Sequence, residues 1–160
     1  MSKTITHELT YDEPVEAVTA MLADPAFREE VCAYQRFTRY DVTIDVDGDT
    51  KKVRIDQWQP TQGMPSFAKK IVGDETNIVQ EETWTSPTHG DITVTIPGKP
   101  GTMSGTATVA ESGVGTVETV SLTVKVNIPL VGGKLEGLIA DLLLKALKAE
   151  NTVGRDYLSR

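Results

Sequence analysis

Apolar residues recur at every second position in several parts of the chain, beginning with residues 4–11, where Ile5, Leu9 and Tyr11 share one side with His7. This period is typical of a strand with one buried and one exposed face. The same alternation, interrupted by turn sequences rich in Gly, Asp and Pro, predicts six further strands. They cover residues 36–47, 52–58, 77–85, 91–96, 103–111 and 115–128. Because most of the intervening loops are short, neighbouring strands are expected to pair antiparallel.

Other segments repeat their apolar residues in helical steps. Helices are predicted over residues 15–24, 25–34, 64–71 and 134–158. For the first of them we expect Asp12 as the capping residue and Pro14 in the first turn. The last carries the strongest signal, because its apolar residues form one wide stripe. At 1.5 Å per residue this helix is roughly 37 Å long, so it must pack against something large.

The order of elements is therefore one strand, two short helices, six more strands and a long C-terminal helix. Helices segregated to one face of an antiparallel sheet define the α+β class. The chain has 160 residues, of which 39% are hydrophobic, enough for a full core with room for a cavity. Since no linker, repeat or low-complexity tract interrupts it, we expect a single domain over residues 1–160.

The net charge, the length of the apolar stretches and the N-terminal sequence argue against several classes of protein. The formal net charge is −7, from 16 Lys and Arg against 23 Asp and Glu, and such a surface repels nucleic acid and anionic headgroups. No apolar stretch reaches the ~18 residues that a membrane span needs. The N-terminus lacks the charged-then-apolar run of a signal peptide, which predicts a cytoplasmic protein.

Residues for metal or covalent chemistry are sparse. Cys32 is the single cysteine, so it forms no intramolecular disulfide, and we expect it to be a small buried side chain. His7 and His89 are far apart in the sequence and show no ligand spacing. There is no Gly-x-Ser-x-Gly motif and no phosphate-binding glycine pattern. We therefore expect no cofactor.

Four pieces of sequence carry a family resemblance. They are residues 11–18, the Asp-Pro step at 24–25, Trp84 in a middle strand, and residues 130–136 before the last helix. With the order of elements, they make the chain resemble the START-like superfamily of pollen allergens, polyketide cyclases and dehydrases, and lipid-transfer domains. Within it, the chain is most similar to an actinobacterial family of unknown function.

The resemblance implies a helix-grip fold, in which a curved antiparallel sheet of about seven strands wraps around the long C-terminal helix. It also implies a hydrophobic cavity between sheet and helix that holds a lipid-like, isoprenoid or polyketide-like molecule. We expect the cavity lining to include Tyr40, Gln57, Met64, Phe67, Gln80, Trp84, Met103, Leu122, Val124 and Ile139. The loop at 63–67, which combines Gly and Pro with apolar residues, is a candidate gate.

Polar residues on the apolar faces are the candidates for chemistry. His7, Gln57, Gln80 and Glu82 lie on the apolar sides of their strands, and Glu150 lies in the helical stripe. An inward polar group costs roughly 1–3 kcal/mol unless it is hydrogen-bonded, so each needs a partner, a water or a ligand. Glu82 would face outward if a bulge shifted its strand, because the preceding residue is also a glutamate.

Three functions are compatible with these observations. The one we favour is the binding or carriage of a hydrophobic small molecule. In the second, a cyclase or dehydratase, His7 acts as an acid–base pair with Glu82 or Glu150 on a polyketide-like substrate. Ordinary structural roles for these three residues are favoured over catalysis. The third is a protein-interaction module whose acidic surface meets a basic partner. Neither the ligand nor the oligomeric state follows from the sequence.

Overall fold

The computed structural model describes residues 2–160, and its centre is one seven-stranded antiparallel sheet. The strands are β1 (Lys3–Tyr11), β2 (Arg39–Asp47), β3 (Thr50–Pro60), β4 (Glu75–Ser86), β5 (His89–Thr95), β6 (Thr102–Ser112) and β7 (Gly115–Lys125). Their order across the sheet is β1-β7-β6-β5-β4-β3-β2, so the first strand pairs with the last. The predicted strands, including their antiparallel pairing, are confirmed.

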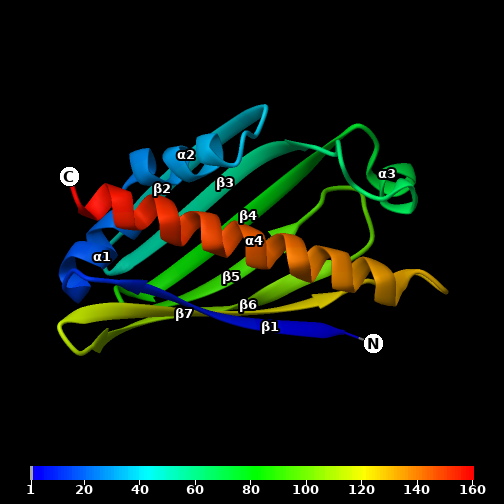
Figure 1. The fold of residues 1–160 in the computed structure, drawn as a ribbon. Coiled ribbons are helices and arrows are strands. Elements are labelled where there is room, and N and C mark those ends of the chain that lie inside the picture. Colours follow the sequence, from blue (N-terminus) through cyan, green and yellow to red (C-terminus); the bar gives the residue numbers. More distant parts are fainter. Residues whose placement is uncertain (1) are drawn as a thin grey trace.

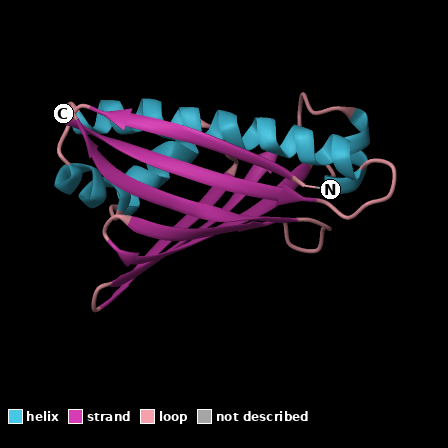
Figure 2. Ribbon diagram, turned by 90° about the horizontal axis from the view of Figure 1, so that it is seen from below, coloured by secondary structure: helices cyan, strands magenta, loops and turns pink. Residues whose placement is uncertain are grey.

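Four helices accompany the sheet: α1 (Val15–Leu22), α2 (Pro25–Tyr34), α3 (Ser66–Val72) and α4 (Gly132–Leu158). Figure 1 shows α4 lying along the sheet, with α1 and α2 near its C-terminal end and α3 near its N-terminal end. Figure 2 shows the strands curving beneath it. The predicted helix-grip arrangement is confirmed.

Some element boundaries differ from prediction. Asp12 does not cap α1, because Pro14 occupies the N-cap position and no side chain bonds to the first turn. The cap of α2 is Asp24, whose Oδ1 accepts from the Ala26 N–H at 3.0 Å. β2 begins three residues later than predicted, because Arg36 at the end of the α2 turn has φ of 61°.

The end of β7 also differs, at Lys125 rather than residue 128. The backbone N–H of Val126 donates to Glu136 Oε2 at 2.9 Å. Its hydrogen-bond partner is therefore a side chain of α4 instead of the backbone of a neighbouring strand. A side-chain carbon at Gly132 would lie 2.5 Å from the Val126 carbonyl oxygen. This close approach directs the chain from the last strand into α4.

The C-terminal half of α4 packs closely on its neighbours. A side-chain carbon at Gly154 would lie 2.7 Å from the Tyr11 ring, so only glycine allows the helix to approach β1 this closely. Tyr157 contacts Phe27 edge to face, with ring centroids 5.5 Å apart, and its hydroxyl donates to the Asp24 carboxylate. These contacts hold the C-terminal end of the helix against β1 and α2.

Candidate functional site

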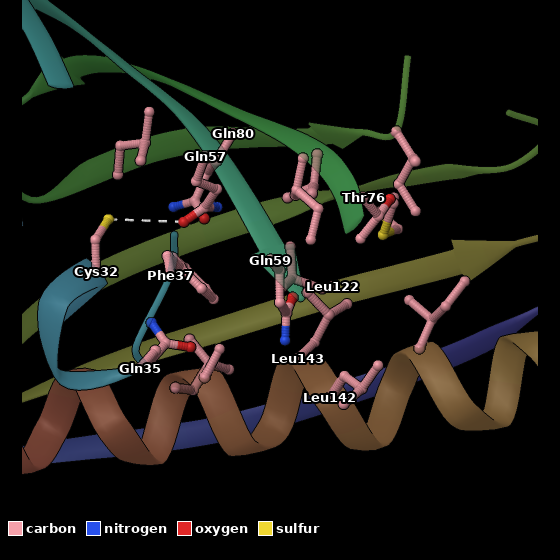
Figure 3. Close-up of a pocket in the computed structure, with 18 of the residues that line it drawn as sticks. Cys32, Gln35, Phe37, Gln57, Gln59, Thr76, Gln80, Leu122, Leu142 and Leu143 are labelled. Atoms are coloured by element: carbon pink, nitrogen blue, oxygen red, sulfur yellow. Dashed lines mark hydrogen bonds between the residues drawn. The ribbon is translucent and has the colours of Figure 1, made fainter. Parts of the chain in front are cut away.

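A pocket of about 170 Å³ lies between α4 and the inner face of the sheet (Figure 3). Most of its wall is aliphatic or methionine. The sheet and the β5–β6 loop contribute Ile55, Ile78, Ile92, Val94, Ile96, Met103, Val120 and Leu122, and α4 contributes Leu135, Leu138, Ile139, Leu142, Leu143, Ala146 and Leu147. Residues from α2 and α3 complete the wall. The pocket is therefore built from the same residues that the period-two and helical patterns turn inward.

The residues that line the pocket extend along most of α4. The lining runs along α4 from Leu135 to Glu150, a distance of roughly 22 Å at 1.5 Å per residue. Gln35 and Phe37 after α2, Gln59 on β3 and Leu142 on α4 also line the pocket, and all four are partly exposed.

Besides Gln35 and Gln59, the wall of the pocket includes the polar side chains of Gln57, Gln80 and Thr76. Gln57 is 8% exposed, and its Oε1 accepts from the Cys32 thiol at 3.7 Å (Figure 3). Gln80 donates through Nε2 to Glu82 Oε2 at 2.6 Å. Thr76 is 4% exposed, and its hydroxyl has no hydrogen-bond partner within residues 2–160. Burial raises the pKa of the Cys32 thiol to about 12, which keeps it protonated.

One end of the pocket is charged, and its centre is Arg28 of α2. Both terminal nitrogens of Arg28 donate to the Glu82 carboxylate, at 2.9 and 2.8 Å, and its Nε donates to the Leu22 carbonyl at 2.9 Å. Glu82 also accepts from Trp84 Nε1 at 2.8 Å. Both side chains of this ion pair are 3% exposed. Its members are thus almost fully engaged with one another.

The pair sets the ionisation of both partners. Burial alone would raise the pKa of Glu82, but the guanidinium of Arg28 and the hydrogen bonds outweigh it and lower that pKa below its ordinary value. Burial likewise disfavours the charged form of Arg28, and the carboxylates of Glu82 and Glu150 raise its pKa above the ordinary value. Arg28 and Glu82 therefore carry opposite charges that cancel.

Two further carboxyl groups complete what we call the Arg28 cluster: Arg28, Glu82, Glu118 and Glu150. Glu150 of α4 lines the pocket, and its Oε1 lies 3.8 Å from Arg28 Nη1. Glu118 of β7 is 3% exposed, and its Oε1 has no hydrogen-bond partner within residues 2–160. Burial and the neighbouring carboxylates raise the pKa of Glu118 well above its ordinary value, and burial raises that of Glu150 to about 7. Burial therefore favours the protonated form of both carboxyls.

Of the ten residues expected to line the cavity, some line the pocket and the others do not. Lining the pocket are Gln57, Met64, Gln80, Met103, Leu122 and Ile139. The other four, Tyr40, Phe67, Trp84 and Val124, are absent from its wall in the described part of the chain. Trp84 lies over Gly90 of the neighbouring strand, where its ring fills the space of a side chain. Tyr40 is 37% exposed, and Val124 packs in the core.

The three candidates for catalysis are also separated. Glu82 faces inward, because the irregularity in β4 lies beyond it, between Trp84 and Ser86. Glu82 and Glu150 meet around Arg28. His7 is half-buried on the edge strand β1, opposite Val120, and is not among the described residues that line the pocket. The geometry therefore does not assemble the expected pair of His7 with a glutamate at the pocket.

Sequence reasoning missed Arg28 and Glu118. For Glu118 a signal was present, because it precedes Val120 by two residues and so continues the inward alternation of β7. For Arg28 the signal was weak. It lies four residues before Cys32, on the buried side of α2, but nothing local indicates that a carboxylate 54 residues away would pair with it.

Within residues 2–160, no group of three or more His, Cys, Asp or Glu side chains is arranged to hold a metal ion. None of the helices in the described part of the chain combines the length and apolarity required to cross a membrane.

The curved sheet gripping a C-terminal helix is the helix-grip fold of START-like proteins. The chain belongs to the family described as "Protein of unknown function (DUF2505)", whose model matches residues 6–158. The uncharacterized protein Rv0481c of Mycobacterium tuberculosis is 32% identical over 111 residues, which are 65% of this chain and 63% of the relative. The match thus spans less than two thirds of the relative's length. These findings confirm the predicted actinobacterial family of unknown function.

Two solved structures show the same fold. TTHA0849 from Thermus thermophilus superposes with a TM-score of 0.68 at 18% identity, covering 98% of this chain and 97% of that one. The Zhui aromatase/cyclase from a Streptomyces species superposes with a TM-score of 0.70 at 11% identity, covering 100% and 95%. At these identities the likeness concerns the fold.

Proposed function

We propose that this protein binds an elongated, mostly apolar small molecule in the pocket between the sheet and α4. The observation that carries the proposal is the mostly aliphatic wall around a volume of about 170 Å³. Protein interiors are ordinarily packed with few voids larger than a water molecule. An engineered cavity of about 150 Å³ with a similar lining stays dry and binds benzene. The pocket is therefore large enough for an apolar guest.

The energetics favour a guest as well. Each Å² of apolar ligand surface that is removed from water against this wall stabilises the complex by roughly 25 cal/mol. Pockets for drug-sized ligands are commonly about 300–1,000 Å³, so the smaller volume here favours a slim chain or a small ring system over a bulky lipid.

A cyclase- or dehydratase-type activity is the second candidate. Glu150 favours it, because this carboxyl lines the pocket and its pKa of about 7 is suited to general acid–base work. The fold shared with a protein named as an aromatase/cyclase is compatible with this candidate. Binding remains the better supported function, since Glu82 is occupied by Arg28 and the pocket lining contains no histidine within residues 2–160.

The test is the binding of an apolar fluorescent probe, N-phenyl-1-naphthylamine, to the purified protein and two matched variants. Ala146 lines the pocket, so Ala146→Phe places a ring inside it. Lys145, the preceding residue, is exposed, so Lys145→Phe adds the same ring outside. We expect the first variant to weaken probe binding at least tenfold and the second to change it less than twofold.

Two results would overturn the proposal. One is a wild-type protein that shows no saturable probe binding, together with no apolar compound found by mass spectrometry after organic extraction. The other is an Ala146→Phe variant that is folded, as judged by thermal unfolding, and binds the probe as tightly as the wild type does.

A further inference from the structure

The two ends of the pocket differ in chemistry. At one end, Arg28 and Glu150 line the wall, and Glu82 and Glu118 lie behind them. At the other end, the wall is made by apolar residues such as Leu135. A ligand with one polar end therefore has one favourable orientation, with that end at the Arg28 cluster.

The charge of Arg28 is already balanced before a ligand enters. Three of its five N–H groups donate, one to the Leu22 carbonyl and two to the Glu82 carboxylate, and Glu150 Oε1 lies 3.8 Å from Nη1 as a second carboxyl near the same cation. Arg28 is also the one cationic residue in the pocket lining over the described part of the chain. A ligand carboxylate at this end would face the Glu150 and Glu118 carboxyls with no unengaged cation, and burying such a charge unpaired is costly.

Hydrogen-bond acceptors, by contrast, remain open to a ligand. The Glu150 carboxyl lies 3.8 Å from Arg28, too far for a hydrogen bond, and its side chain is 13% exposed. Gln80 donates its amide N–H to Glu82, which leaves its carbonyl oxygen to accept from a ligand. The buried hydroxyl of Thr76 also has no partner in residues 2–160, but it lies six residues from Glu82 along β4, roughly 20 Å away, and so belongs to a different part of the pocket wall.

We infer that the pocket selects an apolar molecule whose polar end donates a hydrogen bond, an alcohol or an amine, to Glu150, and that it discriminates against carboxylates. This inference rests on the proposed function and names the ligand class of the same site. The charged and titratable groups facing Glu150 are Arg28 from α2, Glu82 from β4, Glu118 from β7 and Tyr11 from β1. Arg28 and Glu82 cancel, so the charge that a ligand meets is that of the glutamate pair.

The test compares three probes of equal chain length: dodecanol, dodecylamine and dodecanoate. The affinity of each compound is measured by its displacement of bound N-phenyl-1-naphthylamine at pH 8. Each compound is used at concentrations at which it does not form micelles. We expect dodecanoate to bind at least tenfold more weakly than the other two. If dodecylamine binds more tightly than dodecanol, the contact with Glu150 is ionic. If the two bind equally, the contact is a neutral hydrogen bond. Both results support a ligand whose head group donates.

Two variants test whether Glu150 is the residue that discriminates against dodecanoate. Glu150→Gln keeps the size of the side chain and removes its charge, so the gap between dodecanoate and dodecanol is expected to fall below threefold. Asp141→Asn removes a charge from an exposed position of α4, so the gap is expected to persist. Thermal unfolding verifies that both variants are folded.

The failure of the inference is distinct from the failure of the proposed function. If dodecanoate binds as tightly as dodecanol, or if Glu150→Gln leaves a tenfold gap unchanged, the inference is overturned while ligand binding stands. If none of the three compounds and no probe binds, the proposed function itself is overturned.

Discussion

Replacement of Arg28 by methionine removes the cation of a buried ion pair while nearly preserving the volume of the side chain. The change deletes two hydrogen bonds to Glu82, at 2.9 and 2.8 Å, and one to the Leu22 carbonyl at 2.9 Å. Glu82, which is 3% exposed, would keep Gln80 and Trp84 as donors but would lose its counter-charge. The substitution therefore leaves a carboxylate buried in a low-dielectric interior.

The expected loss of stability follows from this geometry. Breaking a buried pair by removing one partner costs about 3–5 kcal/mol, chiefly because the remaining charge is uncompensated. The two surviving donors to Glu82 place Arg28→Met in the lower half of that range. Domains of this size are stable by only about 5–15 kcal/mol, so the variant is expected to fold but to unfold at clearly lower denaturant.

Urea unfolding at pH 7, followed by circular dichroism, measures the effect. The double variant Arg28→Met/Glu82→Gln removes both charges, so it is expected to be less destabilised than the sum of the single variants. Arg160→Met is the matched control. Arg160 also pairs with a glutamate, Glu30, but on an exposed surface where solvent screens the interaction. Its loss is expected to be far smaller.

The reasoning would be refuted by an Arg28→Met variant whose stability is within about 1 kcal/mol of the wild type, well below the cost of breaking a buried pair. It would also be refuted by single-variant losses that simply add in the double variant, because additivity would mean that Arg28 and Glu82 do not interact energetically.

Two further predictions concern groups at the pocket. The raised pKa of Glu150, about 7 against an ordinary 4.5, adds stability that is complete below pH 4.5 and is lost as pH rises through 7, by up to about 3 kcal/mol. Urea unfolding should therefore show lower stability at pH 8 than at pH 5, and Glu118→Gln/Glu150→Gln should abolish the difference; equal wild-type stabilities would contradict the assignment. The Cys32 thiol, with its pKa near 12, should react with an aromatic disulfide reagent roughly a hundredfold more slowly in the native than in the urea-unfolded protein. Rapid native labelling would show that the thiol is not held protonated.

Much of the fold could be predicted from local patterns. The alternation of Val120, Leu122 and Val124 predicts both the strand and its buried face, and the apolar stripe from Leu135 predicts the long helix. The predicted boundaries are wrong where a tertiary contact overrides the local pattern. β7 stops early because Glu136 takes the N–H of Val126, ten residues before it in the sequence.

The site could be predicted less completely. Placing Gln57, Gln80 and Glu150 inward required only the period of their segments. The same rule turned Trp84 inward, but its ring lies flat over Gly90 and therefore does not reach the pocket. That difference depends on the neighbour across the strand pair, which the pattern of one segment does not contain.

The amino-acid sequence by itself determined which face of most strands and of the long helix is buried, because the periods of 2 and 3.6 residues are properties of the local backbone. From those faces follow the class of the fold and the position of the core. Only the tertiary structure decided which inward residues pack against one another and which border an open pocket. That outcome depends on how the sheet curves and how closely α4 approaches it, as at Gly154 and Tyr11. It also depends on the pairing of Arg28 with Glu82, groups that meet only after the chain has folded.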